Sequence, residues 1–253
     1  MKIILITGAS SGIGAEFARQ LDKEVSDIDE IWMVARRKER MEKLAKELAH
    51  PVRIFAEDVR NQSFYERLEQ ELKETAADVK ILVNNAGYGI VGFVAERSKE
   101  EMLGMLDVNC KAMTAVTMLC LPYMKRNARI LHMSSSAAYV PQPKFAVYAA
   151  TKAYVLQFSR ALSEELRTRG IYVTAVCPGP VETEFFDKAE QYGKSYGFKK
   201  FFRMQPDRVV AEAIRASRRK QTVVTPGIGM KGFRILAKAV PHAILLRVMR
   251  WMK

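Results

Sequence analysis

Tyr148 and Lys152 lie four residues apart in a stretch whose apolar residues recur at helical spacing. Side chains four apart on a helix share one face, so the phenol and the ammonium would project together. A free phenol ionises near pH ~10, and a neighbouring cation favours the phenolate and lowers that pKa. The pair therefore predicts a tyrosine that acts as a general acid or base near neutral pH. The four-residue spacing alone also occurs by chance in amphipathic helices.

A glycine-rich turn follows the first apolar run of the chain. Lys2 to Ile6 leads into the run Thr7 to Gly14 (TGASSGIG), and an amphipathic helical pattern begins directly afterwards. Glycines let the backbone approach a pyrophosphate, and the free N–H groups at the start of a helix bind the anion. The spacing differs from the dinucleotide fingerprint G-x-G-x-x-G, so the predicted phosphate site rests on the strand-turn-helix context.

Cations follow the second apolar run, at the position where an NAD site carries an acid for the ribose. The sequence there is Val34 to Lys38 (VARRK), without an acidic residue. Arg36 and Arg37 could make charge-assisted contacts with a 2′-phosphate, so NADP (as NADPH) is favoured and NAD is less favoured. The alternative is that Arg37 and Lys38 are an ordinary solvated start of a helix, an interpretation that suits Lys38 better than Arg36.

Polar side chains follow the fourth and fifth apolar runs. Asn84 to Gly87 (NNAG) ends one run and Ser134 to Ser136 ends the next, while Asn109 interrupts an otherwise apolar helix. An amide buried in such a helix costs stability unless it is hydrogen-bonded. Open α/β sheets bind ligands at the carboxyl ends of their strands, which makes these polar groups candidates for a site.

The elements that would carry these residues alternate along the chain. Seven short apolar or β-branched runs are separated by helical patterns: 2–6, 31–35, 52–56, 81–84, 129–133, 172–177 and 222–225. Such alternation predicts parallel βαβ units with right-handed crossovers. One helix is expected over Arg37 to Leu48, another after Asn61 as its cap, and the helix of Tyr148 should stop at Gly170 after about 30 Å. We predict one α/β domain with a doubly wound parallel sheet of about seven strands and helices on both faces.

Composition narrows the class of protein. A length of 253 residues with 49% apolar residues suits one domain with a large core. The three cysteines have no CxxC spacing, which favours a reduced, cytoplasmic protein. The three histidines are scattered, so we expect no metal. No stretch approaches the roughly 20 apolar residues that a membrane span needs.

Residues 183–205 interrupt the alternation of strands and helices. Aromatic, lysine and glycine residues are frequent there, and no strand pattern is present. A segment of this kind beside a strand end predicts a lid over an apolar substrate. The alternative is a pair of helices that completes the core.

Positive charge gathers late in the chain. From Lys199 to Lys253 there are 14 Lys or Arg residues against Asp207 and Glu212, and the whole chain has a net charge of +13. No nucleic-acid motif accompanies these cations, so we expect no nucleic acid but an anionic small molecule, an acidic protein or a membrane surface. We divide the chain into a domain of residues 1–228 and a basic, apolar extension of residues 229–253. The extension could lie in an anionic membrane interface, pack on the body or bridge a dimer.

Taken together and in this order, the motifs resemble those of a short-chain dehydrogenase/reductase over nearly the whole chain, to about Thr225. They are the runs 7–14, 84–87 and 178–183 (PGPVET) together with Asn109, Ser135, Tyr148 and Lys152. The resemblance implies a Rossmann-like domain in which Tyr148 protonates the carbonyl oxygen and Ser135 donates a hydrogen bond to it. It further implies that Lys152 binds the nicotinamide ribose and lowers the pKa of Tyr148, and that Asn109 holds a water in a proton relay.

The same resemblance places the cofactor. Asp58 and Val59 would lie near the adenine, and Thr183 would hold the nicotinamide carboxamide. Other residues that would contact the cofactor, besides Arg36, Arg37, Tyr148 and Lys152, are Gly8, Ser10, Ser11, Gly12, Ile13, Gly14, Asn85, Ala86, Gly87, Pro178, Gly179 and Val181. In one departure, Ala138 and Tyr139 stand where a glycine is common, which we expect to narrow the substrate mouth.

The sequence therefore predicts a cytoplasmic, NADPH-dependent enzyme that reversibly reduces a ketone or 3-oxoacyl carbonyl, with an acyl thioester on a carrier as one substrate option. The resemblance implies a homodimer or homotetramer. Two alternatives stay open: a non-catalytic NADP-binding sensor, and a membrane-associated lipid-processing reductase. A pure sensor would not need to keep Ser135, Tyr148 and Lys152 together.

Overall fold

The computed structural model of the chain describes residues 1–185 and 203–251. Within them seven strands form one sheet in the order β3-β2-β1-β4-β5-β6-β7, and every neighbouring pair is parallel. The strands are β1 (Lys2–Thr7), β2 (Glu30–Val34), β3 (Val52–Phe55), β4 (Asp78–Asn84), β5 (Arg129–Met133), β6 (Tyr172–Val176) and β7 (Val223–Val224). The predicted fold class and strand number are confirmed.

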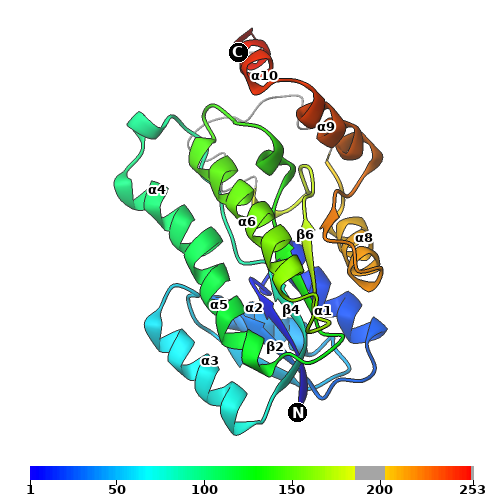
Figure 1. Cartoon of the computed structure of the whole chain (residues 1–253). Coiled ribbons are helices and arrows are strands. Elements are labelled where there is room, and N and C mark those ends of the chain that lie inside the picture. The colour runs from blue at the N-terminus through cyan, green and yellow to red at the C-terminus, as the bar shows by residue number, and fades with distance from the viewer. Residues whose placement is uncertain (186–202, 252–253) are drawn as a thin grey trace.

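Helices connect the strands and cover both faces of the sheet (Figure 1). They are α1 (Gly12–Glu24), α2 (Lys38–Ala45), α3 (Gln62–Glu74), α4 (Lys99–Leu106), α5 (Met113–Cys120), α6 (Ala146–Glu165), α8 (Pro206–Arg218), α9 (Ile228–Ala239) and α10 (His242–Trp251). A π-helical turn over Asp107–Ala112 joins α4 to α5, and short 3₁₀ turns cover Val94–Glu96, Leu121–Tyr123 and Ser136–Tyr139.

The alternation of side chains along β1 explains the layered core. Ile4 and Ile6 point into one apolar cluster with the buried residues of α1, α2 and α8. Ile3 and Leu5 point into the other, formed with α3, α5 and α6. Successive strand residues face opposite sides, so a strand with helices on both faces must be apolar throughout. Such strands appear in the sequence as continuous apolar runs. The positions of the predicted runs therefore match the strands of the structure closely.

The strand order reverses beside β1, because β1 pairs with β2 on one side and with β4 on the other. In open α/β sheets a crevice for ligands forms at this switch point, outside the carboxyl ends of the strands. Thr7 and Asn84 end the two strands there and are paired in register. The topology therefore places the glycine-rich turn opposite the segment that begins at Asn85.

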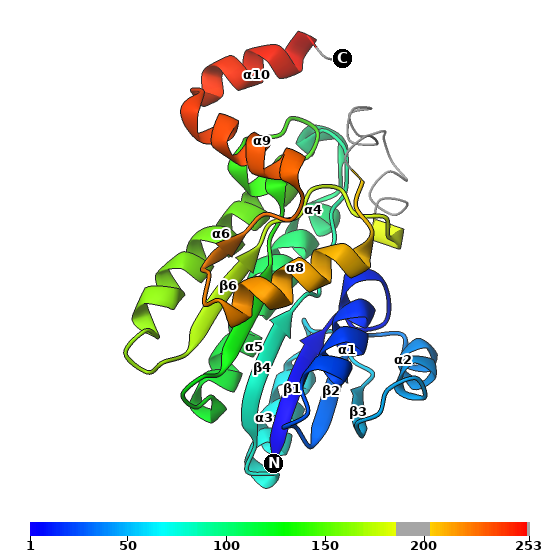
Figure 2. The same cartoon turned by 90° about the vertical axis from the view of Figure 1, so that its right-hand side faces the viewer.

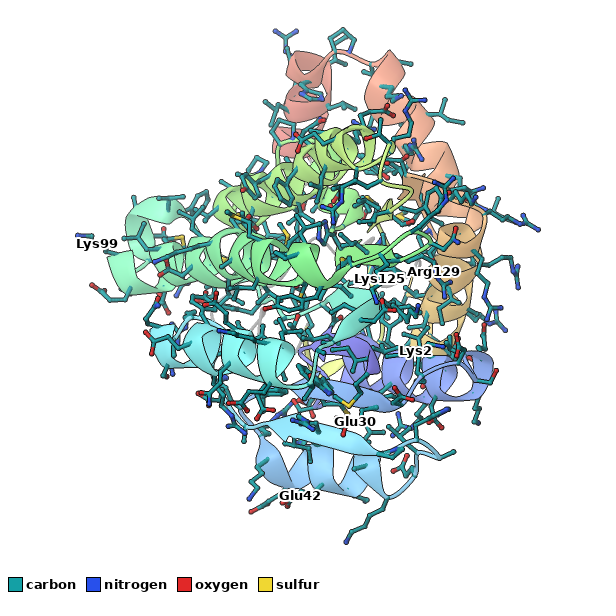
Figure 3. The ribbon with its side chains drawn as sticks, turned by 60° about the horizontal axis from the view of Figure 1, so that its bottom comes forward. Lys2, Glu30, Glu42, Lys99, Lys125 and Arg129 are labelled. Carbon is teal, nitrogen blue, oxygen red and sulfur yellow. The ribbon has the colours of Figure 1, made fainter. Side chains whose placement is uncertain are left out.

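The amino edge of the sheet is charged and structural. Lys2 and Glu30 begin their strands there, and Figure 3 shows them on the same side of the molecule as Lys125 and Arg129. Glu30 pairs with Arg53 at 3.0 Å, and Lys125 approaches the carboxylate of Asp78 at 3.6 Å. These charged side chains pair with one another. The candidate site lies at the opposite edge of the sheet, at the carboxyl ends of the strands.

Some predicted element boundaries shift. Helix α2 ends at Ala45, before the expected Leu48, and α6 covers Ala146–Glu165 before the chain turns at Gly170 with φ +67°. Asn61 is the N-cap of α3, but its side chain makes no capping hydrogen bond. Among the described residues, no helix is both long and apolar enough to cross a membrane.

Candidate active site

The glycine-rich turn is shaped by close backbone contact. Gly8 has φ +69°, and a Cβ on Gly14 would lie 2.2 Å from the carbonyl oxygen of Gly8. Any side chain at position 14 would therefore push the first turn of α1 away from β1. Ser11 is the N-cap of α1, and its side chain makes no capping hydrogen bond. The first N–H groups of this helix keep their capacity to bind an anion, as a dinucleotide pyrophosphate requires.

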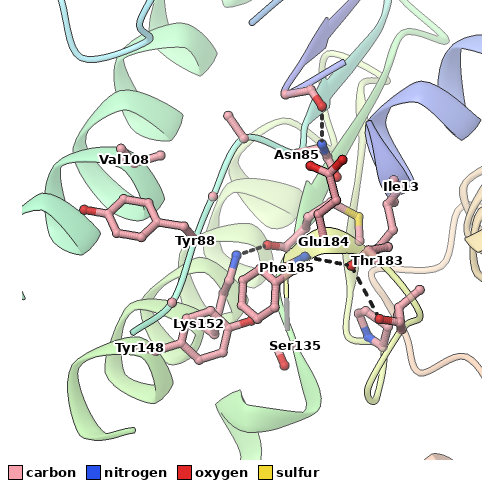
Figure 4. A pocket seen from close by; sticks show the side chains of 18 of the residues that line it. Ile13, Asn85, Tyr88, Val108, Ser135, Tyr148, Lys152, Thr183, Glu184 and Phe185 are labelled. Atoms are coloured by element: carbon pink, nitrogen blue, oxygen red, sulfur yellow. Dashed lines mark hydrogen bonds between the residues drawn. The ribbon is translucent and has the colours of Figure 1, made fainter. Parts of the chain in front are cut away.

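Thr7 and Asn85 tie this turn to the segment after β4. The hydroxyl oxygen of Thr7 accepts hydrogen bonds from the backbone N–H groups of Asn85 and Ala86, at 3.0 and 3.1 Å. The amide of Asn85 donates back to the carbonyl oxygens of Thr7 and Gly8, at 3.1 and 3.2 Å. Figure 4 shows Asn85 at the end of the strand, above the cavity. Asn85 thus fixes the position of the glycine-rich turn, which would bind a phosphate.

Arg37 lies across the mouth of the glycine-rich turn. Its guanidinium donates to the hydroxyls of Ser10 (3.2 and 3.3 Å) and Ser11 (2.6 Å). Another nitrogen of the same group donates to the carboxylate of Glu184 at 2.8 Å, and Arg40 pairs with that carboxylate too. The two arginines hold the pKa of Glu184 down to about 2. A fixed cation therefore stands beside the predicted phosphate site.

Arg36 is less constrained. Its side chain is 72% exposed, and its guanidinium lies 3.9 Å from the carboxylate of Asp58. The guanidinium of Arg60 donates a hydrogen bond to the same carboxylate at 2.8 Å, and this bond lowers the pKa of Asp58. Lys38 pairs with Glu42 one turn along α2, as expected for a solvated helix start.

Tyr148, Lys152 and Ser135 come together on one wall of the cavity (Figure 4). Tyr148 and Lys152 are buried on α6, one turn apart, as their spacing predicted. The ammonium of Lys152 donates to the carbonyl oxygen of Met133 at 2.7 Å and lies 5.7 Å from the centre of the Tyr148 ring. Ser135 directs its hydroxyl toward Tyr148 from the end of β5. Two hydroxyls and a cation therefore share a small volume.

The expected lowering of the tyrosine pKa is wrong for this structure. Burial raises the pKa of Tyr148 to about 12, and the hydrogen bond from Ser135 offsets only part of this effect. Burial also lowers the pKa of Lys152 to about 8. The cause is apolar packing, because Phe145 stacks on the Tyr148 ring at 4.2 Å and Phe185 lies 5.4 Å away. Tyr148 is therefore a neutral phenol at pH 7, the form that can give a proton.

Asn109 occupies a π-helical turn where the sequence predicted an ordinary helix. Its amide donates to the backbone carbonyl of Tyr88 (2.9 Å) and to the hydroxyl of Thr151 (3.0 Å), and its oxygen accepts from the N–H of Tyr88 (3.0 Å). These bonds satisfy the buried amide and hold the segment after β4 against α6. Asn109 does not line the cavity itself, and its role in a water relay stays a prediction.

The segment from Pro178 to Thr183 closes the side opposite Tyr148. The carbonyl of Pro178 accepts a hydrogen bond from the Ser136 backbone at 2.8 Å, which joins this segment to the end of β5. Thr183 packs its methyl group against Gly12. Gly179 lies so close to Met230 that a Cβ there would approach the sulfur at 2.7 Å. Helix α9 therefore contributes to this wall.

These parts enclose a cavity of about 780 Å³ at the carboxyl edge of the sheet. Apart from Gly14 and Asn109, every predicted site residue lines it: Gly8, Ser10, Ser11, Gly12, Ile13, Arg36, Arg37, Asp58, Val59, Asn85, Ala86, Gly87, Ser135, Tyr148, Lys152, Pro178, Gly179, Val181 and Thr183. An anion-binding turn, flanking arginines and a wall of hydroxyls fit the successive parts of a dinucleotide. Within the described residues, no group of His, Cys, Asp and Glu is arranged to hold a metal.

Sequence reasoning missed several lining residues. Glu184 pairs with a residue 147 positions away, so no local signal marks it. Phe145 precedes Tyr148 by three residues, a spacing that could have suggested their contact. Met230 and Phe233 also line the cavity, and they belong to the predicted extension of residues 229–253.

The expected effect of Ala138 and Tyr139 on the substrate mouth is wrong. The hydroxyl of Tyr139 forms a 2.6 Å hydrogen bond with Thr225, and neither residue lines the cavity. Of the predicted lid, residues 186–202 lie outside the described part of the chain.

Comparison with known proteins agrees with this geometry. The family model for short chain dehydrogenases matches residues 2–193. Sulfoacetaldehyde reductase 2 of Chromohalobacter salexigens is 38% identical over 192 residues, covering 72% of this chain and 74% of that protein. A short-chain dehydrogenase of Sphingobium yanoikuyae, solved with NADPH, superposes with a TM-score of 0.78 at 28% identity, covering 96% of this chain and 98% of that one. A bulky-bulky ketone specific alcohol dehydrogenase of Comamonas testosteroni gives 0.75 at 28% identity, covering 94% and 92%.

The chain belongs to the short-chain dehydrogenase/reductase family. It is an NAD(P)-dependent oxidoreductase with a Rossmann-like fold.

Proposed function

We propose that this protein reduces the carbonyl of an apolar ketone or 3-oxoacyl compound to an alcohol, reversibly, with NADPH as the hydride donor. The observation that carries the proposal is the meeting of Tyr148, Ser135 and Lys152 on a wall that continues into the glycine-rich turn. A reduced nicotinamide bound in this groove would supply the hydride, and the protein's task is to receive the negative charge that develops on the carbonyl oxygen.

Tyr148 acts as the general acid. Its raised pKa keeps the phenol protonated at neutral pH, and a positioned acid typically contributes ~10²–10⁴-fold to a rate. Ser135 donates a second hydrogen bond to the same oxygen. Two donors aimed at a developing alkoxide stabilise the transition state more than the starting ketone.

Lys152 stabilises the phenolate that remains after Tyr148 has given its proton. Its ammonium is held by the Met133 carbonyl beside the Tyr148 ring, so the cation is in place before reaction. The desolvation that lowers the pKa of Lys152 also strengthens its field, because little water screens it. Asn109 supports this arrangement by fixing the segment that contains Gly87, which lies against Lys152.

NADPH is preferred because of the charge at the adenosine end. Arg37 is prearranged by Ser10 and Ser11, and the mostly exposed Arg36 lies next to it in the chain, 3.9 Å from Asp58. A 2′-phosphate would replace Glu184 as the partner of Arg37. The NADPH complex of the Sphingobium relative is consistent with this choice.

The substrate is apolar because aromatic rings surround the acid. Phe145 and Phe185 pack on Tyr148, and Ile90 belongs to the same cluster. Such walls exclude water and favour a carbonyl with apolar substituents.

A substrate panel tests this proposal. Purified protein is mixed with NADPH and with ketones, quinones, aldehydes or oxoacyl thioesters, and loss of NADPH absorbance is followed, with NADH as the matched cofactor control and carbonyl-free mixtures as blanks. We expect turnover of bulky apolar ketones or oxoacyl thioesters, faster with NADPH than with NADH at low cofactor concentration. No turnover of any carbonyl would refute the proposal.

A further inference from the structure

Helix α9 (Ile228–Ala239) presents a different surface on each of three sides. One side faces the body: Met230 and Phe233 line the cavity, and Ala237 is buried. The second side is apolar yet faces water, since Ile228, Ile235 and Leu236 are 88%, 69% and 50% exposed. With 3.6 residues per turn, Lys231, Arg234 and Lys238 fall together on the third side, between the other two.

The body fixes the orientation of α9. The backbone N–H of Gly227 donates to the carboxylate of Glu212 on α8 at 3.3 Å, and Lys231 approaches the same carboxylate at 3.7 Å. Met230 sits against Gly179 beside the cavity. The exposed apolar side is therefore a fixed surface of the protein.

Helix α10 (His242–Trp251) continues this surface. Figures 1 and 2 show α10 projecting beyond the rest of the molecule, at the end opposite the amino terminus. Ile244 is 53% exposed there, and Arg247 is exposed beside it. A projecting apolar helix in water forfeits the hydrophobic stabilisation that burial would give.

Charge indicates what covers this surface. Residues 229–253 contain six Lys or Arg residues and no Asp or Glu. A second copy docking through the same surface would bring two acid-free, positive faces together, and like charges oppose such a symmetric contact. An anionic bilayer suits both sides of α9. Its hydrocarbon phase would cover the exposed apolar side chains, and its negative headgroups would pair with the lysines and arginines.

We propose that α9 and α10 form a peripheral membrane-binding surface that docks on anionic lipid, with Ile228, Ile235, Leu236 and Ile244 entering the interface and the neighbouring cations meeting the headgroups. The opposite side of α9 lines the cavity, so docking holds the cavity next to the bilayer. An apolar carbonyl compound dissolved in lipid would then reach the site without crossing water. This consequence for the substrate rests on the proposed reduction, whereas lipid binding does not.

Vesicle co-sedimentation of the full chain tests the surface. The probes are vesicles of phosphatidylcholine alone and vesicles of phosphatidylcholine with phosphatidylglycerol. The protein should sediment with the anionic vesicles and stay in solution with the neutral ones, and added salt should weaken binding. Equal binding to both vesicles, or binding to neither, would overturn the proposal.

Two pairs of variants locate the contact. Ile235→Asp and Ile244→Asp should each lower the partition constant by about tenfold. The matched control is Met118→Asp on α5, where another large apolar side chain is 65% exposed, close to the 69% of Ile235. Lys238→Gln with Arg247→Gln should lower binding by about fivefold per charge, whereas Lys23→Gln with Lys73→Gln, which removes the same charge from α1 and α3, should have little effect.

Two further readouts separate the possible failures. If Ile235→Asp changes the oligomer mass by light scattering but leaves vesicle binding intact, the surface joins copies of this chain and the proposal is wrong. Turnover of a water-soluble ketone should be equal in the wild type and in all of these variants. Loss of vesicle binding with retained turnover therefore bears on the surface alone, and absence of turnover in the wild type bears on the proposed function alone.

Discussion

Arg37 donates to Glu184 at 2.8 Å while the rest of its guanidinium holds the hydroxyls of Ser10 and Ser11. This bond joins α2 to the segment that follows Thr183, across the place where a 2′-phosphate would lie. A carboxylate and a phosphate compete for one cation. If the protein uses NADPH as we propose, Glu184 competes with the 2′-phosphate for Arg37.

Replacing Glu184 by Gln should tighten NADPH binding. The amide removes the carboxylate that pairs with Arg37, and an exposed ion pair of this kind is worth roughly fivefold in affinity at most. NADH lacks the 2′-phosphate and should bind as before. Cofactor fluorescence titration measures both. Glu42→Gln, on the neighbouring turn of α2, is the matched control, and weaker NADPH binding by Glu184→Gln would show that the carboxylate supports the site instead.

Arg37→Ala should weaken NADPH by about 10–100-fold, the effect of losing charge-assisted hydrogen bonds, and should weaken NADH far less. Arg36→Ala should cost about fivefold or less, because its side chain is mostly in water. The same titrations compare the two variants. An equal loss for NADPH and NADH in Arg37→Ala would contradict the assignment of the phosphate site.

The rate of reduction should fall as pH rises above about 8. Burial lowers the pKa of Lys152 to about 8, so the cation that stabilises the tyrosine's conjugate base is lost there. Tyr148 itself stays protonated through this range because its pKa is raised to about 12. A profile of kcat against pH at saturating NADPH measures this limb. A rate that stays level to pH 10 would remove Lys152 from the mechanism.

Lys152→Met should abolish most turnover without loss of stability. A buried ammonium carries a desolvation cost that an apolar side chain of similar length does not. Since the pKa of Lys152 is lowered from 10.5 to about 8, the unfolded state binds more protons between these values. The free energy of unfolding of the wild type should therefore rise from pH 8 to pH 10.5 relative to the variant, by about 3 kcal/mol at most. Denaturant unfolding at both pH values checks this, and a variant that is much less stable at pH 7 would assign Lys152 a structural role.

The sequence predicted the parts of the site that depend on local pattern. Continuous apolar runs located the strands, because strands covered by helices on both faces are apolar throughout. The strand-turn-helix context identified the turn from Thr7 to Gly14, and helical spacing brought Tyr148 and Lys152 together.

Features that depend on tertiary packing were beyond sequence reasoning. The raised pKa of Tyr148 comes from burial beneath Phe145 and Phe185, whose positions follow from how α6 meets the segment after β6. The π-helical turn at Asn109 has no local signature, since the bonds to Tyr88 and Thr151 that satisfy it are long-range. For the same reason, the partner of Arg37 could not be found from its neighbours in the chain.

The central claim is that Tyr148 gives its proton to the substrate carbonyl, and the most direct test compares Tyr148→Phe with the wild type on a ketone that the substrate panel identifies. Phenylalanine keeps the ring between Phe145 and Phe185 and removes only the hydroxyl. We predict that kcat falls by at least about 10²-fold while the dissociation constant for NADPH is unchanged. A variant that keeps its kcat would contradict the account.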